Sequence, residues 1–247
     1  MKVLFVNPNT SVSVTERIAG VARAAASAGT EVLAVTAPYG VPYIATRAEA
    51  VIGGRVALEL LAEHAPGCDV AVIAAFADPG LGGARELMLM PVIGMAEAAM
   101  LTSCMLGRRF SIVTFATAME PWYLECVETN GLSARLASIR CVPGGFRDIA
   151  TVAEEKADVL VEACCAAVAE DEADVVILGG APLAGLAGAI ADRVPVPLVD
   201  GVAAAMRQAE VLGALRPRKA TAGTFRTPDA KPVTGVPPAL EALFARR

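Results

Sequence analysis

The sequence predicts an α/β protein of two similar lobes, each with a parallel β-sheet flanked by helices. One template (Asp, apolar run, small-residue turn, Gly-Leu) occurs at residues 69–81 and again, 105 residues later, at residues 174–186. Apolar runs that enter small-residue turns alternate with helical patterns, which is typical of βα units with right-handed crossovers. Ligands of such sheets bind beyond the carboxyl ends of strands, where backbone N–H groups at helix starts hold anions. Two such turns predict one site between the two lobes.

Composition limits the classes of function. The chain has 247 residues, a net charge of −5, 55% apolar residues and 19% charged residues. Without a run of Lys or Arg, nucleic acid and anionic membranes are not expected partners, and the expected partner is a small-molecule substrate. The high apolar content predicts a buried subunit interface, hence a homo-oligomer. No apolar stretch approaches the roughly 20 residues of a membrane span, and no signal peptide is recognised, so we expect a cytoplasmic protein.

The cysteines do not form a metal-binding pattern. The six cysteines show no C-x-x-C spacing, and His64 is the only histidine. A structural zinc site needs four ligands at characteristic spacings. We therefore expect reduced thiols and no metal.

Strands and helices are predicted to alternate in each half. In the first half, strands are expected at 3–6, 31–36, 70–77 and 91–95, with helices at 15–28, 48–62, 81–90 and 96–106. In the second half, strands are expected at 110–114, 134–141, 174–178 and 197–199, with helices at 120–130, 152–170 and 202–212. The tail includes an expected strand at 220–225 and a last short helix. The segment 41–47 is irregular and is a candidate lid or pocket wall. Residues 1–98 with about 206–247 are assigned to the first lobe, and 99–205 to the second.

Several linked motifs resemble the Asp/Glu/hydantoin racemase family, and most closely its hydantoin and allantoin racemases. These motifs are Phe5-Val6-Asn7-Pro8-Asn9-Thr10, Phe76-x-Asp78-Pro79-Gly80-Leu81, residues 91–100, residues 110–114 and residues 199–205. The resemblance covers nearly the whole chain. It implies a two-lobed α/β fold with a pseudo-twofold axis, no cofactor, frequent oligomers and a substrate that sits between the lobes.

The sequence departs from the family in its chemistry. Family racemases remove a proton next to a carbonyl with one cysteine thiolate, while a second cysteine protonates the opposite face. The resemblance places these thiols at the two core turns, where this chain has Ala75 and Gly180. Neither side chain can transfer a proton, so the two-cysteine mechanism is not inherited.

The resemblance implies that the ligand-holding positions of the family are kept. They are Asn7, Asn9, Thr10, Thr114 and the backbone N–H groups around Phe76 and Ala181. These groups are suited to a carboxylate or to the carbonyls of a cyclic ureide. Alone, the first three would be interpreted as a turn with a helix cap. Ala75 and Gly180, at the thiol positions, are also expected to border the substrate. Phe115 replaces a common hydroxyl residue, which indicates a tighter or more apolar pocket.

A replacement acid or base must come from elsewhere in the chain. Asp78 and Asp200 are the candidates, and each is also in a position to cap a helix. Three hypotheses follow for the function. In the first, the chain is an enzyme that acts beside the carbonyl of a hydantoin-like ring or small carboxylate with groups other than cysteine. In the second, it catalyses decarboxylation, hydrolysis or desulfurisation of a related ring, and an activated water, with or without a metal, replaces the thiols. In the third, it binds a ligand without turnover.

Overall fold

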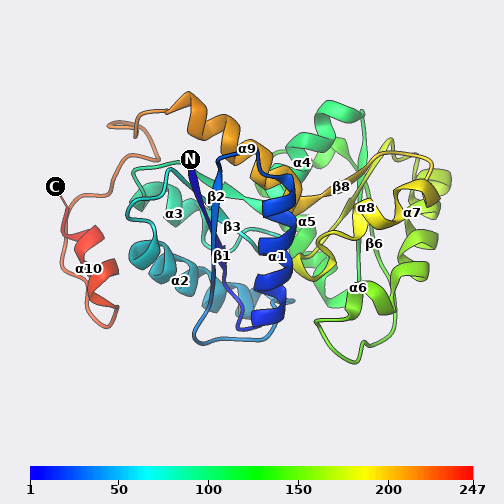
Figure 1. Cartoon of the computed structure of the whole chain (residues 1–247), viewed down its shortest axis with the longest axis horizontal. Helices are drawn as coiled ribbons and strands as arrows, with labels where there is room; N and C mark the ends of the chain where they lie inside the picture. The colour runs from blue at the N-terminus through cyan, green and yellow to red at the C-terminus, as the bar shows by residue number, and fades with distance from the viewer. Residues whose placement is uncertain (247) are drawn as a thin grey trace.

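The protein consists of two lobes, each built on a four-stranded parallel sheet, as shown by a computed structural model that describes residues 1–246. The strand orders are β2-β1-β3-β4 and β6-β5-β7-β8, so the same order occurs twice. Figure 1 shows the two sheets side by side with helices around them. The predicted α/β fold with two similar sheets is confirmed. Within residues 1–246, no helix is long and apolar enough to cross a membrane.

The first lobe contains residues from both ends of the chain. Its strands are β1 (Lys2–Asn7), β2 (Glu31–Thr36), β3 (Val70–Ile73) and β4 (Val92–Gly94). Its helices are α1 (Val12–Ala25), α2 (Arg47–His64), α3 (Leu81–Leu87) and α10 (Pro238–Phe244). Ser11 caps α1 and Thr46 caps α2, each with its hydroxyl accepting a backbone N–H of the first turn. Both starts follow the usual chemistry of helix N-caps.

The second lobe repeats this plan. Its strands are β5 (Phe110–Thr114), β6 (Leu136–Cys141), β7 (Val175–Leu178) and β8 (Leu198–Asp200). Its helices are α5 (Glu120–Thr129), α6 (Val152–Glu155), α7 (Ala157–Asp171) and α8 (Leu186–Ile190), with short 3₁₀ turns at 117–119, 133–135, 181–183 and 191–193. The central strands β5 and β7 are buried along their whole length, as expected for a parallel sheet covered on both faces.

Two helices join the lobes. α4 (Met95–Leu106) leads from β4 of the first sheet to β5 of the second, and α9 (Gly201–Leu215) leads back from β8. They pack against each other, and the Gln208 side-chain amide of α9 donates hydrogen bonds to the Ala98 carbonyl and to the Thr102 hydroxyl of α4. The expected lobe boundaries at 98/99 and 205/206 fall inside these two helices. The pair therefore fixes how the two sets of strand ends face each other.

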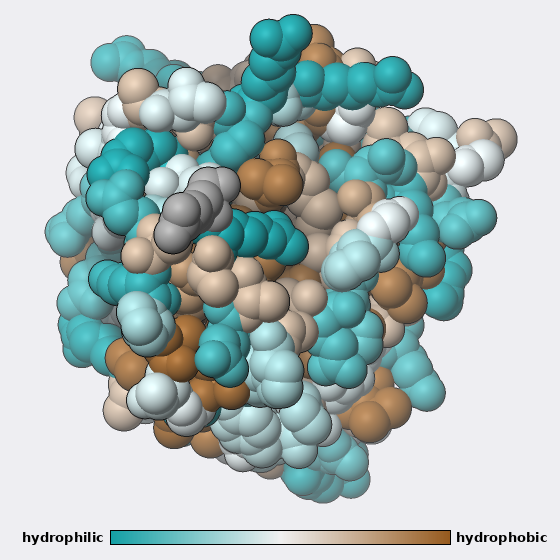
Figure 2. Space-filling view, turned by 90° about the vertical axis from the view of Figure 1, so that its left-hand side faces the viewer, coloured by the Kyte–Doolittle hydropathy of each residue, from teal (hydrophilic) through white to brown (hydrophobic). Residues whose placement is uncertain are grey.

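The C-terminal segment covers the outer side of the first lobe. Leu240 and Leu243 of α10 are buried in an apolar cluster with residues of α2, including Val56 and Leu60. Figure 2 views this end of the molecule, where hydrophilic side chains surround small apolar patches. The tail thus adds to the core of one lobe and lies away from the junction between the lobes.

Two predicted elements are wrong. Residues 220–225 form no strand; the chain bends there, and Gly223 has a positive φ of 80°, which belongs to a turn. The predicted helix over 152–170 is two helices, because the backbone at Lys156 (φ −106°, ψ 7°) leaves helical values. The buried Lys156 side chain forms hydrogen bonds to carbonyls of the second lobe at this break.

Candidate functional site between the lobes

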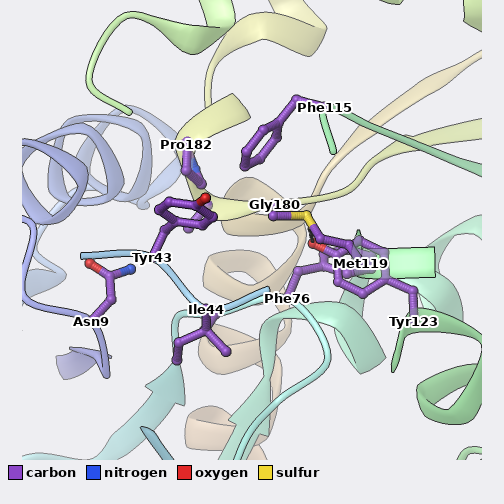
Figure 3. A pocket seen from close by; sticks show the side chains of 11 residues that line it. Asn9, Tyr43, Ile44, Phe76, Phe115, Met119, Tyr123, Gly180 and Pro182 are labelled. Carbon is purple, nitrogen blue, oxygen red and sulfur yellow. Dashed lines mark hydrogen bonds between the residues drawn. The ribbon is translucent and has the colours of Figure 1, made fainter. Parts of the chain in front are cut away.

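A small cavity lies between the lobes, beyond the carboxyl ends of the central strands. The first lobe contributes Asn9, Tyr43, Ile44, Ala75 and Phe76, and the second contributes Phe115, Met119, Tyr123, Gly180, Ala181 and Pro182 (Figure 3). None of these side chains is charged. The site therefore favours a small neutral ligand that is bound by hydrogen bonds and apolar contacts.

The two repeated turns meet at this cavity. Ala75 and Phe76 follow β3, while Gly180 and Ala181 occupy the corresponding positions after β7. Within residues 1–246, the backbone N–H groups of Phe76 and Ala181 donate to no protein acceptor. Two free backbone donors from different lobes thus border one cavity, an arrangement suited to a carbonyl or oxyanion.

Asn9 adds a side-chain donor. Its Oδ1 accepts hydrogen bonds from the Asn7 Nδ2 and from the Ser11 backbone N–H, both at 3.0 Å. Because both neighbours are donors, the amide orientation is fixed and Nδ2 is left for the cavity; Figure 3 shows this nitrogen on the side toward Tyr43. Asn7 instead organises the turn, since its Nδ2 also donates to the Thr15 hydroxyl at 2.9 Å. The two asparagines therefore have different roles.

Thr10 acts on the cavity through the irregular segment 41–47. Its backbone N–H donates to the Val41 carbonyl at 2.9 Å, which holds the start of this segment against the turn after β1. The segment then places Tyr43 and Ile44 in the cavity wall. Thr10 itself does not line the cavity, so its contribution is to position these two residues.

Thr114 lies behind the wall of the second lobe. Its hydroxyl is fully buried and donates to the Gly179 carbonyl at 2.7 Å, which holds the second turn in place. At the cavity wall itself, the Tyr123 hydroxyl donates to the Met119 sulfur at 3.4 Å. Burial raises the pKa of Tyr123 above its usual value, so this phenol is a neutral donor at neutral pH.

Ala75 and Gly180, where the resemblance places the family thiols, both border the cavity. Ala75 is almost fully buried in the wall. Gly180 has a φ of 123°, which side chains rarely adopt, and a Cβ placed there would lie 2.9 Å from the Cε1 of Phe115. The Phe115 ring therefore occupies the space beside Gly180.

The carboxylate of Asp78 caps a helix. Its two oxygens accept the backbone N–H groups of Ala96 and Glu97 at 2.8 Å each, at the start of α4. Burial raises the pKa of Asp78 to about 7, while these two hydrogen bonds act in the opposite direction. Glu97 in turn pairs with Arg85 of α3. Asp78 does not line this cavity; it lines a second pocket between α3, α4 and α5, together with Glu97 and Trp122.

Asp200 has the corresponding capping role in the second lobe. One of its oxygens accepts the N–H groups of Val202 and Ala203 at the start of α9, and the other accepts the Gly185 N–H at 2.6 Å. Asp200 does not line the cavity either. The catalytic role predicted for the two aspartates stays a prediction, and the geometry gives both a capping role.

The cysteines contribute nothing to the wall of this cavity. Burial raises the pKa of the Cys141 thiol to about 11 and that of Cys164 to about 12, so neither is a thiolate at neutral pH. In the part of the chain that the structure describes, no three Cys, His, Asp or Glu side chains are grouped to hold a metal ion.

The fold and the cavity define a two-lobed α/β protein with the same sheet plan in each lobe and a cavity between the lobes. The family model for Asp/Glu/Hydantoin racemase matches residues 3–209. The chain therefore belongs to the Asp/Glu/Hydantoin racemase family and is a racemase-family enzyme.

Relatives and solved structures agree with this assignment. The chain is 32% identical over 236 residues to the hydantoin racemase of Pseudomonas sp. (strain NS671), covering 95% of each chain. It is 34% identical over 233 residues to the hydantoin racemase of Paenarthrobacter aurescens, covering 94% of this chain and 99% of that protein. The structure of allantoin racemase from Klebsiella pneumoniae superposes with a TM-score of 0.89 at 35% identity, covering 98% of each chain.

Sequence reasoning missed part of the cavity wall. Met119 and Tyr123 are four residues apart across the start of α5, a spacing that places them on one helical face. That spacing is a weak signal, since apolar pairs of this kind are common in helices. Pro182 also lies in the wall.

Proposed function

We propose that the chain binds a small hydantoin-like cyclic ureide in the cavity between its lobes and acts on the carbon beside the ring carbonyl. The observation that carries this proposal is the convergence of three unpaired donors on one uncharged cavity. They are the backbone N–H groups of Phe76 and Ala181 and the Nδ2 of Asn9. Because no Lys or Arg among residues 1–246 lines the cavity, a neutral ring is favoured over a carboxylate.

The wall indicates which ring substituent fits. Apart from the donors, the cavity is lined by apolar and aromatic side chains, including Ile44, Phe115 and Met119. A polar substituent would lose its water there without finding hydrogen-bond partners. We therefore propose that the substituent on the ring is apolar.

Hydrogen bonds to the ring carbonyl would stabilise the enolate that forms when the neighbouring carbon loses its proton. Tyr43 from the first lobe and Tyr123 from the second are the side chains in the described wall that carry a hydroxyl. Proton transfer therefore falls to these hydroxyls and to water. Since a neutral phenol is a far weaker base than a thiolate, we expect turnover to be slow.

A second candidate function, binding without turnover, is supported by Phe115. Its ring fills the space beside Gly180, where a family racemase would need a thiol. Proton NMR in deuterated buffer distinguishes the two functions. Loss of the α-proton signal above the buffer background supports the enzyme, and saturable binding without exchange supports the binding protein.

Binding is tested by titration with 5-benzylhydantoin and allantoin. Benzylhydantoin is expected to bind at least about tenfold more tightly, because burial of its phenyl group adds a favourable term of roughly 1.5–3 kcal/mol. Equal affinities, or tighter binding of allantoin, would contradict the proposed apolar selectivity.

Asn9→Asp tests the donor directly. The substitution keeps the oxygen that organises the turn but replaces the cavity-facing nitrogen with an acceptor. We expect hydantoin affinity to fall by about 10- to 100-fold. The matched control is Asn130→Asp, which makes the same change outside the cavity and should leave affinity within about twofold. An unchanged affinity in Asn9→Asp would rule out this contact.

The composition also leads us to propose a cytoplasmic homo-oligomer. Large apolar side chains are exposed on the two joining helices, including Leu101 and Met105 of α4 and Leu215 of α9. Such a surface is typical of a subunit contact. Sedimentation of the purified protein as a monomer at all concentrations would contradict this proposal.

A further inference from the structure

We infer that Tyr43, Phe146 and Phe115 form an aromatic gate at the edge of the cavity, and that Lys156 is a positioning residue that holds this gate. The ring of Phe146 contacts Tyr43 of the first lobe and Phe115 of the second, each edge-to-face with centroids 5.5 Å apart. Tyr43 and Phe115 line the cavity (Figure 3). Phe146 thus links the two lobes through the cavity wall.

Phe146 lies on the solvent side of this wall. It is partly exposed, does not line the cavity and belongs to the irregular segment between β6 and α6. The segment 41–46, which carries Tyr43, is also irregular. The cavity edge is therefore made of two loops, whereas the opposite wall is made of turns fixed to the central strands. A ligand can enter with least disturbance by separating the rings that the two loops bring together.

Lys156 explains how the loop of Phe146 is held. Its Nζ is buried and donates to the carbonyls of Phe115 at 3.3 Å, Pro143 at 3.0 Å and Gly144 at 2.6 Å. No ion pair to this ammonium is present within residues 1–246. One side chain thus joins the loop before Phe146 to the backbone of Phe115. Hydrogen bonds from a charged donor are stronger than those from a neutral donor.

The gate can be measured without a ligand. Ala75→Cys places a thiol on the cavity wall, and its alkylation by iodoacetamide, followed by peptide mass spectrometry, reports how often the cavity opens. The native Cys164, which is fully buried in the second lobe, serves as an internal reference for general loosening. This design separates the gate from the rest of the fold.

We expect Phe146→Ala in the Ala75→Cys background to raise alkylation of the introduced thiol about tenfold, with the Cys164 rate unchanged. Each lost edge-to-face contact contributes a factor of roughly 2–12 to the closed state. Phe146→Tyr should keep the slow rate. Phe225→Ala, which removes an exposed ring of the tail, is the matched control and should also keep it.

Lys156→Met should raise the rate at the cavity by a similar factor, and combining it with Phe146→Ala should add little, because both act on one gate. Rates within twofold of the Ala75→Cys parent in Phe146→Ala, or a parallel rise at Cys164, would overturn the inference. The choice of ligand rests on the proposed function, but this test does not. If the thiol introduced by Ala75→Cys reacts slowly but the protein binds no hydantoin, the proposed function is overturned and the gate is still supported.

Discussion

Asp78→Gly is expected to lower the free energy of unfolding by about 2–4 kcal/mol, and adding Gly94→Asp is expected to restore most of that loss. The first change leaves the backbone N–H groups of Ala96 and Glu97 without their carboxylate acceptor at the buried start of α4. The second supplies a carboxylate from the position that begins the helix. The two substitutions should therefore be strongly non-additive.

The second lobe shows why this exchange should work. Gly94 pairs with Ile73 in the first sheet, and Asp200 pairs with Leu178 at the matching place in the second. The backbone angles are also alike, with φ −86° and ψ 138° at Gly94 and φ −86° and ψ 123° at Asp200. In both lobes a carboxylate thus caps the start of the equivalent helix, but it comes from Asp78 for α4 and from Asp200 for α9.

Gly94→Asp alone should be destabilising. A Cβ at residue 94 would lie 2.2 Å from the Oδ2 of Asp78, so the two side chains compete for one space. Removing Asp78 vacates that space, and glycine suits the left-handed backbone at residue 78, where φ is 53°.

Urea denaturation of the two single variants and the double variant measures this coupling. Asp229→Gly, which removes a carboxylate from the exposed tail, is the control and should change stability by less than about 0.5 kcal/mol. Additive losses in the double variant would show that the two aspartates do not perform equivalent roles.

The triple variant Ala75→Cys, Gly180→Cys, Phe115→Thr is expected to exchange the α-proton of a hydantoin at least about 100-fold faster than the variant with the two cysteines alone. The reason is the Phe115 ring, which stands 2.9 Å from the place of a Cβ at residue 180. Removing the ring makes room for the second thiol. The positive φ at residue 180 adds strain of about 1–3 kcal/mol, which the fold must tolerate.

Proton NMR in deuterated buffer measures the exchange, and titration checks that each variant binds the ring. The control combines Ala75→Cys with Phe115→Thr, which opens the same space but supplies one thiol only. If the triple variant folds and binds the hydantoin but exchanges no faster than this control, then residues 75 and 180 are not on opposite sides of the bound ring.

The fold was predictable because its signals are local. The strands 31–36 and 110–114 have the predicted bounds, since short apolar runs closed by turn residues leave little freedom. The repeat at a spacing of 105 residues also located the two turns that now face each other. The expected strand at 220–225 failed because a strand needs a partner, and sequence alone does not show whether one is near.

The site was harder to predict because it depends on contacts between distant residues. A helix cap was expected near Asp78, but the helix that it caps is α4, whose capped N–H groups belong to residues 96 and 97. Asn7 and Asn9 look alike in the sequence, and only the hydrogen-bond network separates the turn former from the cavity donor. Phe146 gave no signal, since its role depends on two loops that meet only in the folded protein.

A crystal structure with 5-benzylhydantoin tests the central claim most directly. We predict that the ring lies between the lobes, with carbonyl oxygens within hydrogen-bond distance of the Phe76 and Ala181 N–H groups and of the Asn9 Nδ2, and that the benzyl group lies against the apolar wall. A ring bound outside this cavity, or a cavity that stays empty at saturating ligand, would contradict it.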